Sequence, residues 1–234
     1  MDVGKILIDG LRAAVGVPAA AFAVSAVGLN LQFGYTGLLN FGHVGSMLLG
    51  AYGLAITVDL GGSMWLGVAA GIVAAMLFGL ALGYPTLRLR ADFLAITTIA
   101  ASEILRLVFR SEFARPLTGG VFGIQSFADG FFALNPYPDG VYGVGTFRFD
   151  ERQLWVMTLG WLLVGLGLLA TRRLVHSPWG RTLKAVREDE DATASLGKNV
   201  FLIKLQSLML GGALGALGGM VLAIDQQNVN PDFF

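Results

Sequence analysis

Long stretches of the chain consist of apolar and small residues without a single Asp, Glu, Lys or Arg. These charge-free runs cover residues 13–58, 60–87, 153–171 and 205–224. A helix needs about 20 predominantly apolar residues to cross a bilayer, and each run reaches roughly that length. Because a soluble domain would have to bury all four runs completely, the pattern predicts a polytopic membrane protein.

We expect six transmembrane helices, two of them inside the first run. The predicted spans are residues 13–33, 44–58, 64–85, 92–110, 153–171 and 205–224. Three glycines and several polar side chains interrupt the apolar pattern at residues 34–43, which predicts a broken or re-entrant segment there. The expected fold is therefore an all-α, polytopic transmembrane helix bundle that forms one domain over residues 1–234.

The distribution of Lys and Arg predicts the orientation of the bundle. Residues 172–204 contain seven basic side chains, which are Arg172, Arg173, Arg181, Lys184, Arg187, Lys198 and Lys204. Short loops rich in Lys and Arg face the cytoplasm, so this segment is expected inside. The loop 86–91, with Arg88 and Arg90, then also lies inside, whereas the turn 59–63 and the loop 111–152 lie outside. An even number of spans places both ends of the chain outside.

The predicted outer loop, residues 111–152, is rich in Gly, Phe and Pro. Aromatic, strand-like residues at 141–149 indicate a hairpin or a packed loop. The loop is longer than an ordinary connection, which favours a docking role. A loop that only covers the outer face of the bundle fits the sequence equally well.

Composition and charge exclude several classes of function. Sixteen basic residues balance sixteen acidic ones, and charged residues make up only 14% of the chain. Neutrality without a basic patch argues against nucleic-acid binding, which requires neutralised phosphates. The chain has no Cys, and His43 and His176 are too far apart in sequence to suggest a ligand pair. We therefore expect no metal site, no cofactor and no catalytic residues.

The predicted cytoplasmic stretch 172–204 contains a segment that could bind a partner protein. Residues 177–181 form a turn that leads into an expected helix over 182–196, and Gly197 follows as a stop signal. Leu183, Val186 and Leu196 give this helix a sparse apolar stripe. The pattern is typical of a short amphipathic helix that docks a cytosolic partner, but a solvated linker would look similar.

Four stretches, in the right order, resemble the branched-chain amino acid ABC-transporter permease family. Residues 177–200 resemble its cytoplasmic coupling segment, and residues 28–43 resemble its N-terminal signature. Residues 88–106 and 118–124 resemble two further elements. The resemblance runs from about residue 25 to the end of the chain. It departs from the family at Val121-Phe122, where Pro-Asn is usual, and the family continues past Phe234, so its C-terminal helices are expected to be missing here.

The resemblance implies the permease subunit of an ATP-driven importer of branched-chain amino acids, a transport subunit rather than an enzyme. It implies two permease subunits (a homodimer or a heterodimer), two cytosolic ATPase subunits and an extracytoplasmic solute-binding protein, in the cell membrane of a prokaryote. No G-x-x-x-x-G-K-[ST] motif occurs in the sequence, so the ATPase must be a separate polypeptide. Alternatives are the same machine importing urea, amides, other amino acids or sugars, and a channel or secondary transporter that works without ATP.

Two sets of residues follow as candidate sites. The residues expected to couple the permease to the ATPase are Gly180, Arg181, Arg187, Glu188, Glu190 and Gly197. Polar residues of the interrupted segment are expected along the translocation path, because irregular backbone at membrane depth is tolerated where it lines a wet cavity or is buried in protein. These residues are Asn30, Gln32, Thr36, Asn40 and His43. For each of them, a purely structural hydrogen bond between helices remains the alternative.

Charges and glycines inside the spans predict helix packing. Glu103 and Arg106 are three residues apart on one helix and can pair locally, with Arg110 on the same face. Glycines four residues apart allow two helices to approach closely. Such pairs occur at Gly67 and Gly71, at Gly79 and Gly83, and at Gly211 and Gly215.

Overall fold

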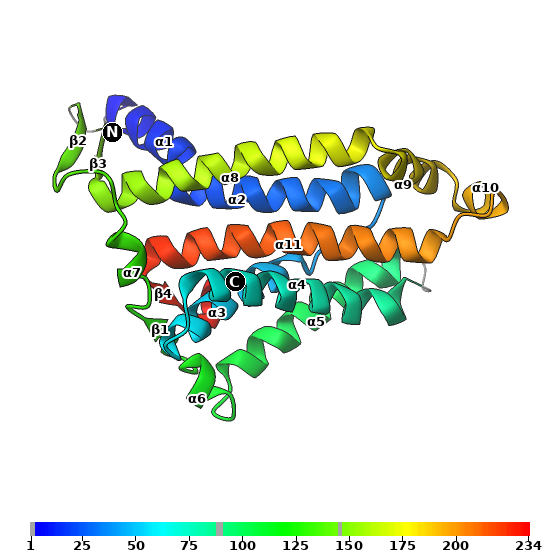
Figure 1. Cartoon of the computed structure of the whole chain (residues 1–234), viewed down its shortest axis with the longest axis horizontal. Helices are drawn as coiled ribbons and strands as arrows, with labels where there is room; N and C mark the ends of the chain where they lie inside the picture. The colour runs from blue at the N-terminus through cyan, green and yellow to red at the C-terminus, as the bar shows by residue number, and fades with distance from the viewer. Residues whose placement is uncertain (1–2, 88–90, 145–146) are drawn as a thin grey trace.

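The computed structural model describes residues 3–87, 91–144 and 147–234, and most of these residues are helical (Figure 1). The long helices are α1 (Val3–Val15), α2 (Val17–Asn30), α3 (His43–Asp59), α4 (Met64–Thr86), α5 (Ala91–Arg110), α8 (Glu151–His176) and α11 (Val200–Gln226). A π-helical segment, η1 (Leu31–Tyr35), extends α2. The shorter helices are α6 (Arg115–Thr118), α7 (Asp129–Phe132), α9 (Pro178–Glu188), α10 (Glu190–Ser195) and the 3₁₀ turn η2 (Pro231–Phe233). The predicted all-α bundle is confirmed.

Each of the six predicted spans coincides with a long helix. Within the described ranges, four helices are long and apolar enough to cross a membrane: α2 with η1, α4, α8 and α11. The helix α3 is shorter, with 17 residues, and α5 carries charged side chains. The count of six crossings therefore stays a prediction. Residues Arg88 and Arg90 of the predicted inner loop lie outside the described residues.

The helix α11 forms the centre of the bundle and packs against α2, α3 and α4 (Figure 1). Glycines make this packing possible. A Cβ atom at Gly219 would lie 2.0 Å from the carbonyl oxygen of Met47 in α3, and one at Gly50 would lie 2.2 Å from that of Ala216 in α11. Since backbone atoms cannot rotate away as side chains can, only glycine permits this spacing at these two positions.

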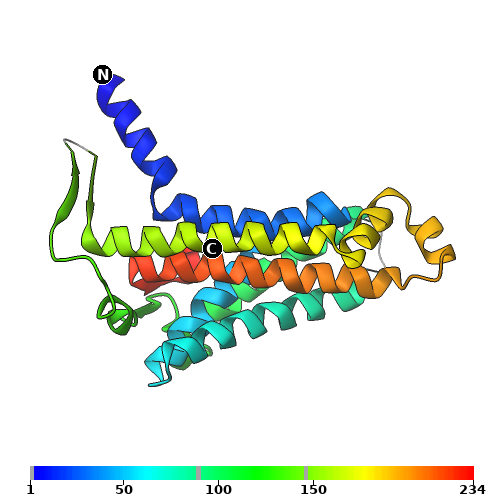
Figure 2. The same cartoon turned by 45° about the horizontal axis from the view of Figure 1, so that its top comes forward.

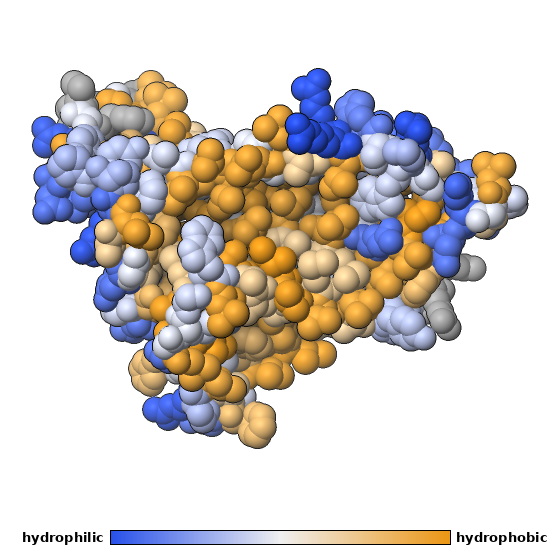
Figure 3. Space-filling view, in the orientation of Figure 1, coloured by the Kyte–Doolittle hydropathy of each residue, from blue (hydrophilic) through white to orange (hydrophobic). Residues whose placement is uncertain are grey.

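The two ends of the bundle differ in structure. At one end lie α9 and α10, in the segment predicted to be cytoplasmic, and at the other lie α1, α6, α7 and the strands (Figure 1). Strand β2 (Val141–Val144) pairs antiparallel with β3 (Phe147–Asp150), with Tyr142 opposite Phe149, so the predicted hairpin is confirmed in its described strands. Strand β1 (Ile124–Gln125) pairs with β4 (Asn228–Val229) and ties the outer loop to the segment after α11. In the space-filling view, apolar side chains occupy the middle of the visible face and hydrophilic ones gather toward its two ends (Figure 3).

The helix α1 was not expected from the sequence, in which residues before 13 were assigned to no element. It ends at Val15, and Gly16 separates it from α2. Because α1 leaves the bundle at an angle to α2 (Figure 2), the first predicted span, residues 13–33, begins about four residues too early.

The predicted pair of Glu103 and Arg106 is confirmed and belongs to a larger network. The guanidinium of Arg106 donates to both carboxylate oxygens of Glu103, at 2.7 and 2.9 Å. It also donates to Asp232 at 2.7 Å, and Arg110 lies 3.3 Å from the same carboxylate. The network joins α5 to η2, which follows α11 along the chain.

Candidate functional site

The chain leaves helical structure between α2 and α3, as the sequence predicted for residues 34–43. The helix α2 continues as the π-helical segment η1 to Tyr35, and the chain is helical again only from His43. Gly37 adopts a φ of 75°, a conformation that favours glycine. Gly42 passes against α5, where a Cβ atom would lie 2.1 Å from the carbonyl oxygen of Thr98. The break is thus buried in part: Thr36, Leu38, Asn40 and Gly42 are buried, whereas Gly37 and Phe41 are exposed.

Four buried polar side chains hold this break against α11, and we call them the polar cluster: Gln32, Thr36, Asn40 and Ser207. Their exposed fractions are 0, 2, 6 and 0%, respectively. The Gln32 amide donates to the Leu208 carbonyl oxygen at 3.1 Å and accepts from Asn40 Nδ2 at 2.9 Å. The amide of Gln32 therefore links α11 to the irregular segment around Asn40.

The two hydroxyl groups of the polar cluster serve the π-helical turn. Thr36 Oγ1 and Ser207 Oγ lie 2.7 Å apart. They lie 3.0 and 3.2 Å from the carbonyl oxygen of Leu31, the first residue of η1. One hydroxyl can donate to this carbonyl while the other donates to its neighbour. The two hydroxyl groups thus provide a hydrogen-bond donor for the Leu31 carbonyl oxygen, at the point where the α-helix changes to a π-helix.

The remaining two residues expected along the path lie apart from the polar cluster. His43 is 7% exposed, and its Nε2–H donates to the carbonyl oxygen of Ser25 in α2 at 3.0 Å. The imidazole fills the space left by Gly215, where a Cβ atom would lie 2.8 Å from Nε2. Asn30, by contrast, is exposed on the surface of α2. The structure therefore brings Gln32, Thr36 and Asn40 together and separates Asn30 from them.

Several buried polar atoms near the break have no hydrogen-bond partner within the described part of the chain. They include Ser25 Oγ, Asn40 Oδ1 and His43 Nδ1. Each belongs to α2, α3 or the segment between them. Buried polar atoms of native proteins are normally hydrogen-bonded, so these three atoms leave bonding capacity unused next to the irregular backbone, as do four others elsewhere in the described residues.

The helix α9 docks on the end of the bundle directly beneath this break. Its first turn is capped by Ser177 Oγ, which accepts from the Gly180 amide at 3.3 Å. Gly180 touches the end of α8, where a Cβ atom would lie 2.4 Å from the backbone of Leu174 and Val175. On the same side, Leu183 and Val186 are buried, at 0 and 1% exposure. Glycine and the apolar stripe thus press α9 against α8 and η1.

Two basic side chains of α9 reach back to η1 instead of facing solvent only. The Arg187 guanidinium donates to the carbonyl oxygen of Gly34. The stem of Arg187 passes Gly37, where a Cβ atom would lie 3.3 Å from its Cγ. One turn earlier, the Lys184 ammonium lies 5.9 Å from the centre of the Tyr35 ring, within cation–π range. The sequence predicted Arg187 as a contact to the ATPase; the residue is exposed, and its guanidinium also bonds the transmembrane segment η1.

The segment after Arg187 differs from the single helix predicted for residues 182–196. Asp189 is extended, with φ −155° and ψ 109°, and its side chain accepts from the Ala192 amide at 2.9 Å. Because Asp189 caps a new helix, α9 ends and α10 begins there. Leu196 is 79% exposed and does not continue the buried stripe, so that part of the prediction is wrong.

The other residues expected to contact the ATPase lie on the outer faces of α9 and α10. Arg181 and Glu188 are exposed. Glu190 forms an ion pair with Lys204 in the first turns of α11. Gly197 is exposed at φ 75° after α10, as expected of a helix-ending glycine. Together they form a polar surface at the end of the bundle, in which Glu190 is partly engaged within the chain.

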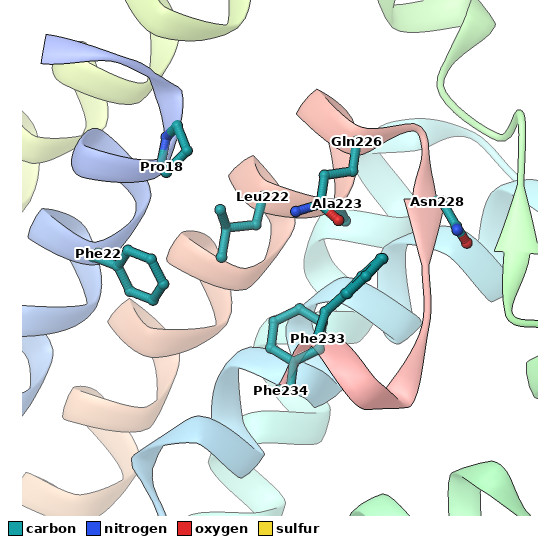
Figure 4. Close-up of a pocket in the computed structure, with 8 residues that line it drawn as sticks. All are labelled: Pro18, Phe22, Leu222, Ala223, Gln226, Asn228, Phe233 and Phe234. Carbon is teal, nitrogen blue, oxygen red and sulfur yellow. The ribbon is translucent and has the colours of Figure 1, made fainter. Parts of the chain in front are cut away.

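Two hollows lie at the opposite end, which the sequence predicted to be outside. The smaller, about 160 Å³, is apolar and lies between α2 and α11, where Phe233 and Phe234 fold back along the end of α11 (Figure 4). This volume is below the roughly 300–1,000 Å³ of ordinary ligand pockets. The larger hollow, about 490 Å³, is open and hydrophilic, and it includes Glu151, Arg152 and Asp225. Among the described residues, no group of three or more His, Asp or Glu side chains is placed to hold a metal ion.

Sequence reasoning missed two partners of the candidate residues, Ser207 and Lys204. Ser207 was a single hydroxyl inside an apolar run, and Lys204 was counted only as an inside charge. A small hydroxyl residue in a span is a signal for a contact between helices. The partner itself could not be read from the sequence, since Thr36 and Ser207 are 171 positions apart.

Comparison with known proteins adds the family context. The family model described as "Branched-chain amino acid transport system / permease component" matches residues 13–234. The LivM permease of the high-affinity branched-chain amino acid transport system of Salmonella typhimurium is 33% identical over an alignment of 225 positions that covers 91% of this chain and 52% of the relative. A probable LivM permease of Methanocaldococcus jannaschii is 24% identical, over 91% of this chain and 67% of the relative.

A relative with another cargo in its name is also similar. The nucleoside ABC transporter permease NupC of Lactococcus lactis is 29% identical, over 80% of this chain and 59% of its own length. No solved structure matches. The chain spans about half the length of the LivM proteins of Salmonella typhimurium and Escherichia coli.

Proposed function

The chain belongs to the branched-chain amino acid transport permease family, and on that premise we propose that it is the transmembrane subunit of an ATP-driven importer of branched-chain amino acids. The observation that carries the proposal is the family match over residues 13–234 of a multi-pass helical bundle. Relatives in two bacteria and an archaeon support the cell membrane of a prokaryote as its location.

The ATPase is a separate cytosolic subunit that docks on α9 and α10. The sequence contains no P-loop motif. Arg181, Glu188 and Glu190 supply the polar contacts, while Gly180 and Gly197 set the angles at which the two short helices leave the bundle. Gly180 lies directly against the backbone of α8. A displacement of α9 therefore displaces α8 as well.

Arg187 and Lys184 carry this movement to the break in α2. Arg187 bonds the Gly34 carbonyl and Lys184 lies over Tyr35, so both act on η1. A π-helical turn is a weak point of a helix and is often found at functional sites. A displacement of α9 would therefore be felt first at η1, and through Thr36 and Ser207 at α11.

The translocation path follows the break. In the conformation described here, Gln32, Thr36 and Asn40 are closed against α11 by hydrogen bonds. We assign them to the gate of the path: when η1 moves away from α11, their amide and hydroxyl groups become available to water and substrate. The unpaired atoms of Ser25, Asn40 and His43 add further bonding capacity along the same line.

Two further partners complete the assembly. A second permease subunit, identical or related, packs beside this one, and an extracytoplasmic solute-binding protein delivers the substrate to the outer loop. The similarity to the nucleoside permease NupC makes nucleosides the second candidate cargo. Uptake competition between leucine and a nucleoside separates the two.

Docking of the ATPase can be tested by charge reversal on matched surfaces. Glu188→Lys changes the exposed end of α9, and Asp139→Lys makes the same change in the exposed outer loop. In co-purification with candidate ATPase subunits, Glu188→Lys should lower ATPase recovery about tenfold, equivalent to roughly 1.4 kcal/mol. Asp139→Lys should leave it unchanged. Equal recovery with both variants, each eluting as a single species, would refute docking on this surface.

A further inference from the structure

The helix α1 has two chemically distinct faces. Leu7, Leu11, Ala14 and Val15 follow the i, i+4, i+7, i+8 spacing of a single helical stripe. Leu7, Leu11 and Val15 are 63, 62 and 41% exposed. Most of this helix precedes residue 13, where the family match begins. Its role is therefore not supplied by the family.

The polar side of α1 contacts the hairpin of β2 and β3. The guanidinium of Arg12 lies 5.3 Å from the centre of the Phe149 ring in β3, so α1 rests against the outer hairpin on that side. Helical spacing places Arg12 about 100° around the axis from Leu11 and further from Leu7. Leu7 and Leu11 consequently point away from the hairpin, whereas Val15, about 60° from Arg12, lies at the edge of the stripe.

The junction with α2 fixes the direction in which α1 leaves the bundle. The Trp161 indole of α8 donates to the carbonyl oxygen of Val15 at 2.8 Å. Gly16, buried between the two helices, directly precedes α2. With this junction, α1 projects to the side of the bundle at its outer end instead of continuing α2 (Figure 2).

The apolar stripe adjoins exposed apolar side chains of α2 and α8. Near the junction, Phe22 of α2 and Leu162 of α8 are 57 and 55% exposed. Both belong to helices that are long and apolar enough to span the membrane. With 13 residues, α1 is about 20 Å long and too short to cross a hydrocarbon core of about 30 Å. A short amphipathic helix at this level suits the membrane interface.

We propose that α1 is an interfacial helix whose Leu7, Leu11 and Val15 face is inserted into the outer leaflet of the lipid bilayer. The occupant of this face is lipid because the stripe continues the apolar surface of α2 and α8, and its Leu7 and Leu11 turn away from the outer hairpin. Its anchorage would hold the hairpin, through Arg12 and Phe149, at a constant height above the membrane. This inference does not depend on the transported substrate or on ATP.

The absence of native cysteine allows a direct test by spin labelling in proteoliposomes. Labels are placed singly through Leu11→Cys on the apolar face and Asp9→Cys on the opposite face. Leu166→Cys on α8 serves as the lipid reference and Asp139→Cys in the outer loop as the water reference. Collision with oxygen, which concentrates in lipid, is compared with collision with a water-soluble nickel chelate.

The proposal predicts opposite results for two positions on the same helix. The label at position 11 should match position 166, with frequent oxygen and rare nickel collisions, and position 9 should match position 139. Nickel access at position 11 equal to that at position 139 would overturn the proposal. Protection of position 11 from both reagents would also overturn it, since a protein partner or second copy would then cover the face. Leu7→Cys provides an independent second site on the same stripe.

Discussion

The close contact between α11 and α3 at Gly219 predicts that a single added methyl group destabilises the protein. In Gly219→Ala the new Cβ would lie 2.0 Å from the Met47 carbonyl oxygen, so α11 and α3 must separate. Overpacking of this kind costs about 3 kcal/mol at the upper end of the usual range. The higher helix propensity of alanine returns at most about 1 kcal/mol. We therefore expect the free energy of unfolding to fall by about 2 kcal/mol.

The matched control is Gly165→Ala in α8. Gly165 is also inside a membrane helix, but it is exposed, and no atom lies within 4 Å of a Cβ built there. Only the gain in helix propensity remains, so this variant should be more stable than the parent by up to about 1 kcal/mol. The same substitution, glycine to alanine, should thus lower the free energy of unfolding at position 219 and raise it at position 165.

The assay is unfolding by sodium dodecyl sulfate from dodecyl maltoside micelles, followed by circular dichroism and tryptophan fluorescence. The two variants should bracket the parent protein, with a separation of about 2–3 kcal/mol between them. If Gly219→Ala is as stable as Gly165→Ala, the close approach of α11 to α3 does not exist in the membrane protein. The reasoning on small-residue packing would then fail.

Three further predictions concern the site. In a double-mutant cycle, Thr36→Val and Ser207→Ala should show a coupling energy of about 0.6–1.7 kcal/mol in the same unfolding assay, and additive effects would contradict their shared hydrogen bond. Arg187→Met should expose the 177–200 segment to limited proteolysis, because its bond to the Gly34 carbonyl is lost, whereas Arg181→Met, on the exposed side of α9, should not. Ser177→Ala should cost about 1 kcal/mol of unfolding free energy through loss of the α9 cap, and an unchanged midpoint would exclude the cap.

The positions of the long helices could be predicted because membrane spans are encoded locally. Runs of apolar residues without charge mark them, and the glycines and polar side chains at 34–43 mark the break. The aromatic, strand-like residues at 141–149 also indicated a hairpin or a packed loop, and β2 pairs with β3 there. All of these features depend on neighbouring residues along the chain.

The features that were missed depend on amphipathic periodicity or on distant partners. The helix α1 escaped because Asp9 and Arg12 interrupt its apolar residues, so that it has no long hydrophobic run. The division between α9 and α10 depends on which of four consecutive acidic residues, 188–191, acts as a cap, and the structure selects Asp189. A run of similar side chains does not identify the capping residue.

The bond of Arg187 to η1 could not be predicted either. Arg187 is exposed, as is usual for an arginine on a predicted cytoplasmic helix, but its bond to Gly34 joins residues 153 positions apart. Glu103 and Arg106 were paired correctly because they are neighbours on one helix. Their third partner, Asp232, was missed for the same reason as Ser207: contacts between helices are not recorded in local sequence.

The central claim is ATP-driven import of branched-chain amino acids. The most direct test is uptake of radiolabelled leucine into proteoliposomes that contain the protein together with candidate partner permease, ATPase and solute-binding protein subunits. We predict accumulation above the external concentration only when ATP is present on the α9–α10 side and the binding protein on the outer-loop side. Equilibration of leucine without ATP, or accumulation of a nucleoside in its place, would contradict the account.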